Sequence, residues 1–125
     1  MTGPIPTIAE AARLIAAKAL SPVELTRACL ARIRQHDLRV NAFLSVTEDQ
    51  ALAAARAAET AIMRDGARGP LHGIPIGLKD IFNTKGLRTT AHSQQLADHV
   101  PDHDSAAGER LAAAGTVMMG KLATH

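Results

Sequence analysis

The sequence is poor in the residues that usually build a core. Its 125 residues include no Trp, no Tyr and two Phe, and Leu, Ile, Val and Phe together provide 28 residues. This share of Leu, Ile, Val and Phe lies just above the share below which a chain is by default interpreted as disordered. Alanine, with 25 residues, is the main apolar residue and favours helices because it loses no side-chain entropy there. We therefore expect a fragment of a larger fold, or a domain that needs a partner, with self-association or a homodimer as one outcome.

Other scarcities exclude whole classes of protein. A single cysteine, Cys29, excludes an internal disulfide and a Cys-rich zinc site, and it fits a reducing, cytoplasmic setting. No apolar run approaches the roughly 20 residues of a membrane span, and Glu10, Arg13 and Lys18 interrupt any N-terminal signal core. The net charge of +2 is small and dispersed, so neither a membrane nor a nucleic acid is an expected partner.

Capping patterns predict four helices. A helix begins with the Thr7–Glu10 capping box, and a second follows Ser21-Pro22, where Ser caps and Pro takes the first helical position. The third and fourth helices are predicted from the same kinds of signal, a capping residue at the start and a glycine after the end. The predicted ends are about Asp37 for the second helix, Thr47 to Asp65 with Gly66 as the stop for the third, and Asp104 as the cap of a fourth running through Ala114.

Extended segments are predicted at residues 41–46, 74–79, 87–91 and 116–119. Their apolar character and their alternation with a helix are typical of a covered α/β sheet. Composition changes near Gly66, because eight of the nine glycines lie from that residue onward. The predicted organisation is a helical segment over residues 1–65 and the first part of a mixed α/β/α core over residues 66–125.

The segment from Gly69 to Phe82 is the most informative for chemistry. Period-two alternation places Lys79 on a face of small residues with Gly77, at the end of a strand expected to be buried. Burial favours the neutral amine, which can act as a general base. The alternative is a lysine paired with a carboxylate; Asp80 is a poor partner, because adjacent strand residues point to opposite faces.

This segment, Gly69-Pro70-Leu71-His72-Gly73-Ile74-Pro75-Ile76-Gly77-Leu78-Lys79-Asp80, strongly resembles the lysine motif of the amidase signature family. The order and spacing of the later pieces, residues 86–93, 104–105 and 110–121, also match, as does the leading segment with residues 21–25 and 41–43. The resemblance implies the amidase signature fold and hydrolysis of a small carboxamide to a carboxylate and ammonia. It implies no metal and no organic cofactor.

The resemblance also implies a Ser–cis-Ser–Lys triad, of which Lys79 alone can be carried over to this sequence. The family's two serines lie in a Gly- and Ser-rich loop downstream of its Gly-Lys motif. The serines present here are Ser21, Ser45, Ser93 and Ser105, none of them in such a setting, and only Ser93 is a candidate pocket residue. The 125-residue chain alone is therefore expected to be inactive. His92 and Ser105 stand where many members have glycine and alanine.

Three alternatives stay open at this stage. Within the family, the chain is also compatible with the glutamine-hydrolysing A subunit of a tRNA-dependent amidotransferase, which would add companion subunits and tRNA as partners. Outside enzymes, it is compatible with a truncated product acting as an interaction module. The DNA after His125 would discriminate between an enzyme and such a truncated product. The histidines and carboxylates of residues 99–104 resemble a metal cluster, but Pro101 favours a surface loop. Lys121 is assigned to packing or surface pairing.

Overall fold

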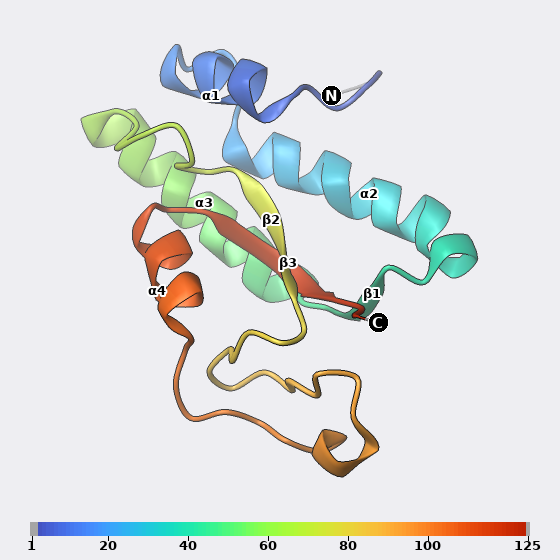
Figure 1. The fold of residues 1–125 in the computed structure, drawn as a ribbon. Helices are drawn as coiled ribbons and strands as arrows, with labels where there is room; N and C mark the ends of the chain where they lie inside the picture. The colour runs from blue at the N-terminus through green and yellow to red at the C-terminus, as the bar shows by residue number, and fades with distance from the viewer. Residues whose placement is uncertain (1–2, 125) are drawn as a thin grey trace.

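A three-stranded mixed sheet is the centre of the fold in the computed structural model, which describes residues 3–124 (Figure 1). Its strand order is β1-β3-β2, with β3 antiparallel to β1 and parallel to β2. The α/β class and the mixed sheet predicted from the sequence are confirmed. The strands are β1 (Phe43–Val46), β2 (Pro75–Lys79) and β3 (Val117–Leu122).

The first two helices begin where their caps predict. Thr7 and Glu10 form the capping box of α1, and the Ser21 side chain accepts a hydrogen bond from the backbone N–H of Val23 at the start of α2. The second helix ends three residues later than predicted, because Asn41 adopts the left-handed conformation that terminates it. The helices are α1 (Ile8–Ala16), α2 (Pro22–Val40), α3 (Glu48–Asp65) and α4 (Ala106–Ala113).

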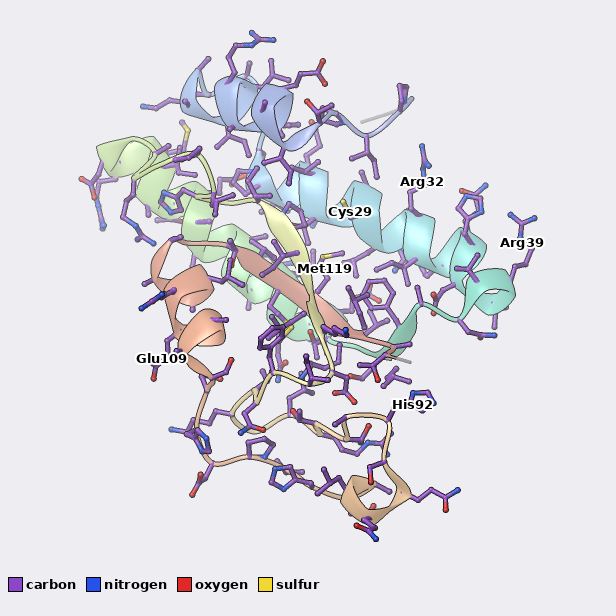
Figure 2. All side chains as sticks on the ribbon, viewed as in Figure 1. Cys29, Arg32, Arg39, His92, Glu109 and Met119 are labelled. Carbon is purple, nitrogen blue, oxygen red and sulfur yellow. The ribbon has the colours of Figure 1, made fainter. Side chains whose placement is uncertain are left out.

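Two apolar clusters join the helices to the sheet. In the cluster between α2, α3 and β3, Ala51 and Ala55 are fully buried, so the small side chains let α3 approach the sheet closely. Met119, at the middle of the molecule in Figure 2, is 3% exposed in the same cluster. The second cluster contains Ile15 of α1 and Ile74 just before β2. Both clusters draw on residues before and after Gly66, and the division at that residue stays a prediction.

The segment between β2 and α4 differs from the prediction. Residues 87–91 were expected to form a strand, but the part of the chain that the structure describes has there only an isolated bridge between Thr84 and Leu87. Ala91 and His92 have φ values of 49° and 61°, and this left-handed conformation ends any extended run. Residues 80–105 therefore form a long loop with a short 3₁₀ helix, η1 (Gln94–Leu96), at the lower end of Figure 1.

Two further boundaries differ from the prediction. Ser105, rather than Asp104, is the N-cap of α4, because its hydroxyl accepts from the backbone N–H of Gly108. Asp104 instead accepts a 2.7 Å hydrogen bond from the backbone N–H of Lys85 and closes the loop. Strand β3 runs to Leu122, beyond the predicted end at residue 119, so that Lys121 is a strand residue.

Candidate functional site

Lys79 is the last residue of β2, and its side chain is exposed. The expectation of a buried lysine at this position is wrong for the described chain. The alternation of β2 explains the difference: Leu78 turns into the core, so Lys79 turns outward together with Gly77. Within residues 3–124 the Lys79 ammonium makes no hydrogen bond or ion pair, so its position is set by the backbone of β2.

Asp80 follows directly and is 1% exposed. Its Oδ2 atom accepts hydrogen bonds from the backbone N–H and the hydroxyl of Thr90, at 3.0 and 2.6 Å. Its Oδ1 atom lies 3.5 Å from the Nζ atom of Lys121. Asp80 thus faces away from Lys79, as the strand geometry predicted, and its carboxylate is paired across the sheet.

Lys121 is the buried lysine of this protein, with a fully buried side chain. Its ammonium donates to the carbonyl oxygen of Phe82 and to the hydroxyls of Thr84 and Thr89, at 2.8, 2.9 and 3.0 Å. Burial lowers the pKa of Lys121, and the nearby Asp80 carboxylate opposes that effect. Sequence reasoning gave Lys121 a packing or surface-pairing role, because the predicted strand ended at residue 119 and Lys121 was not recognised as a residue of a buried strand.

The four serines are engaged in local structure. Ser21, Ser93 and Ser105 accept N-cap hydrogen bonds at the starts of α2, η1 and α4, and Ser21 also donates to Glu59. Ser45 belongs to β1, which β3 separates from β2 and Lys79. Ser93 does line a surface hollow of about 230 Å³, with Arg88 and His92 among its other residues. The His92 ring lies on the outer side of this loop (Figure 2).

The loop of residues 99–104 contacts its surroundings through His103. His103 Nδ1 lies 2.9 Å from a carboxylate oxygen of Asp102, and its Nε2 lies 3.3 Å from the side-chain nitrogen of Asn83. Within residues 3–124, no group of three or more His, Cys, Asp or Glu side chains is arranged to hold a metal ion.

Cys29 is half-buried, and burial raises the pKa of its thiol. Across residues 3–124, none of the helices combines the length and the apolar composition that a membrane span requires.

Comparison with curated proteins gives relatives of much greater length. The A subunit of glutamyl-tRNA(Gln) amidotransferase from Chloroflexus aggregans is 50% identical over 116 residues, which is 93% of this chain and 24% of the relative. The corresponding A subunit from Geobacter metallireducens is 53% identical over 105 residues, 84% of this chain and 21% of the relative. This chain therefore spans about a quarter of the length of the curated relatives it matches.

Comparison with solved structures and with family profiles agrees. The peptide amidase of Stenotrophomonas maltophilia superposes with a TM-score of 0.86 at 35% identity, covering 95% of this chain and 26% of that one. The profile of the Amidase family matches residues 24–125 and so includes the Lys79 motif, the loop and β3. By sequence and by fold, the chain belongs to the amidase family.

Proposed function

We propose that this chain carries the general base of a serine-dependent amide hydrolase, and that the base is Lys79. The observation that supports this most is the contrast between the two strand lysines: Lys121 uses its ammonium in buried hydrogen bonds, whereas Lys79 is exposed. Lys79 also lies at the carboxyl end of a strand in a parallel pair, where open α/β sheets place their ligands. Its amine is thus available to a serine from another segment.

The proposed reaction needs a neutral Lys79 amine. Through a relay serine, the amine takes the proton of a nucleophilic serine, whose oxygen bonds to the amide carbonyl carbon. The C–N bond then breaks as that proton passes to the leaving nitrogen, and water cleaves the acyl–serine ester to release the carboxylate. The segment that supplies the serines would also cover Lys79 and remove water from it, which favours the neutral amine.

We further propose that the 125-residue chain alone does not hydrolyse amides, since its serines serve as helix caps or lie on β1. The test is ammonia release from simple carboxamides by the purified 125-residue chain. Background rates are expected. Steady turnover that Lys79→Ala abolishes would contradict the proposal, because one of the four serines would then be the nucleophile.

The role of Lys79 is tested in the protein expressed from its complete reading frame. Lys79→Ala should lower kcat by about two to four orders of magnitude, the usual cost of losing a general base. Lys79→Arg should be almost as inactive, because a guanidinium stays protonated. The matched control is Lys85→Arg, which changes an exposed lysine in the following loop. Near-normal turnover of Lys79→Arg would show that Lys79 is a structural charge.

A second candidate concerns the substrate: hydrolysis of glutamine as the A subunit of a tRNA-dependent amidotransferase. It is favoured by the names of eight relatives at 47–53% identity, each called the A subunit of glutamyl-tRNA(Gln) amidotransferase. The test compares ammonia release from glutamine and from a simple carboxamide, with and without companion subunits and charged tRNA. Glutamine turnover that rises with these partners would support the candidate; efficient turnover of the simple amide alone would support a free-standing amidase.

A further inference from the structure

A buried polar cluster adjoins the end of β2. Lys121 of β3 belongs to it, together with Asp80 and the loop residues that these two bind. The register of the sheet brings the two segments together, because Leu78 of β2 pairs with Lys121 and Lys79 pairs with Leu122. The cluster therefore contacts the chain at the point where β2 ends and the loop begins.

Lys121 binds the loop at two places along its sequence. An ammonium has three N–H donors, and all three are used, on Phe82 and Thr84 near the start of the loop and on Thr89 further along. Each acceptor belongs to the loop, while the donor belongs to the central strand. The ammonium thus holds the loop against the sheet, and its charge is compensated by Asp80.

Asp80, the residue directly after Lys79, is held through its backbone N–H, its backbone carbonyl oxygen and its carboxylate. Its backbone N–H donates to the carbonyl oxygen of Leu122 at 2.9 Å, and its own carbonyl oxygen accepts from Ala91 at 3.0 Å. Its carboxylate holds Thr90 through two hydrogen bonds. A buried carboxylate left without its cation would be costly, because burial disfavours an unpaired charge. Removing Lys121 should therefore let Asp80 and the backbone beside it move.

We propose that Lys121 and Asp80 are positioning residues for Lys79. The inference rests on the proposed function, since it assumes that Lys79 is the base. It follows from two observations together: the Lys79 side chain has no hydrogen-bonding or charged partner within residues 3–124, and the backbone immediately after it is held by the buried pair. A displacement of about 1 Å can cost roughly 100-fold in rate, so the pair would act on kcat without touching the substrate.

The test uses Lys121→Met in the protein from its complete reading frame, with kcat, KM and a thermal melt measured for each variant. Lys121→Met should lower kcat by about 10- to 100-fold at temperatures where the protein is folded, with KM changed by less than about threefold. Thr90→Val, which removes the hydroxyl that Asp80 accepts, should change kcat in the same direction by less. Lys85→Met, the same change at an exposed lysine, is the control and should leave kcat and KM as they are.

Each result decides the matter. Wild-type kcat in folded Lys121→Met, or a loss explained by the unfolded fraction alone, would overturn the proposal. If Lys121→Met does not fold, Thr90→Val decides: a lower kcat at unchanged KM supports positioning, and a wild-type kcat overturns it. Lys79→Ala in the same assay separates the two ideas, because its full activity would refute the proposed function, whereas its inactivity beside an active Lys121→Met would refute only this inference.

Discussion

The helices of residues 8–65 and the loop of residues 80–105 are held by different kinds of contact. The helices pack through apolar side chains, among them Leu30 and the buried alanines of α3. The loop has few buried apolar residues and is bound instead by Asp80, Lys121 and three threonines. Helical packing is set largely by local pattern, but the loop depends on one lysine that comes more than thirty residues later in the chain.

The largest effect is expected at Gly120 of β3, which pairs with Val46 of β1. A Cβ atom there would lie 2.1 Å from the carbonyl oxygen of Ser45 and 3.1 Å from the Phe43 ring. Gly120→Ala should therefore separate β1 from β3 and cost on the order of 4 kcal/mol or more in unfolding free energy. Gly69→Ala is the control, because nothing lies within 4 Å of its added Cβ. Similar thermal melts for the two variants would refute this account of the β1–β3 contact.

A second pair of substitutions separates the two regions. Lys121→Ala leaves Asp80 buried without its cation and should cost about 3–5 kcal/mol, while Leu30→Ala leaves a cavity among the helices and should cost about 2–5 kcal/mol. Hydrogen exchange, measured peptide by peptide, shows where each variant opens. We expect faster exchange first in residues 80–105 for Lys121→Ala and first in residues 22–65 for Leu30→Ala. Identical exchange patterns would mean that the two regions form one cooperative unit.

This difference also explains what the sequence could predict. The N-caps Thr7 and Ser21 were found because a cap and its partner lie within four residues. The strand expected at residues 87–91 was wrong, because its polar residues bind a distant carboxylate and a distant lysine rather than a neighbouring strand. Contacts of that span leave no periodic pattern.

The two lysines show the same limit at the candidate site. Alternation correctly placed Lys79 and Asp80 on opposite faces of β2. It did not indicate which face would be covered, because that depends on the helices that pack against the sheet, and so the exposed lysine was expected to be buried. The role of Lys79 came from a resemblance to a family motif and remains a prediction.

The pH dependence of stability should report on His72, which lies in the turn before β2 and is 3% exposed. Burial and then the nearby Arg68 lower its pKa, and its Nδ1 accepts a hydrogen bond from the Arg68 backbone N–H. The unfolded state therefore takes up the proton first, and the stability that neutral His72 provides is complete above about pH 6.5 and lost as the pH falls below it. His72→Gln should reduce this dependence between pH 7.5 and pH 5. An equal slope in His72→Gln and the unsubstituted protein would contradict the assignment.

The smallest expected effect lies at the far end of the helical region, in the capping box of α1. The Thr7 hydroxyl accepts from the Glu10 backbone N–H at 3.2 Å, and the Glu10 carboxylate accepts from the Thr7 backbone N–H at 2.9 Å. Thr7→Ala removes the first bond only and should cost about 1 kcal/mol, with faster hydrogen exchange confined to α1. Thr60→Ala, on the exposed side of α3, makes the same change where no cap exists and should be neutral or slightly stabilising. Faster exchange in the loop of residues 80–105 upon Thr7→Ala would show that the two regions are coupled after all.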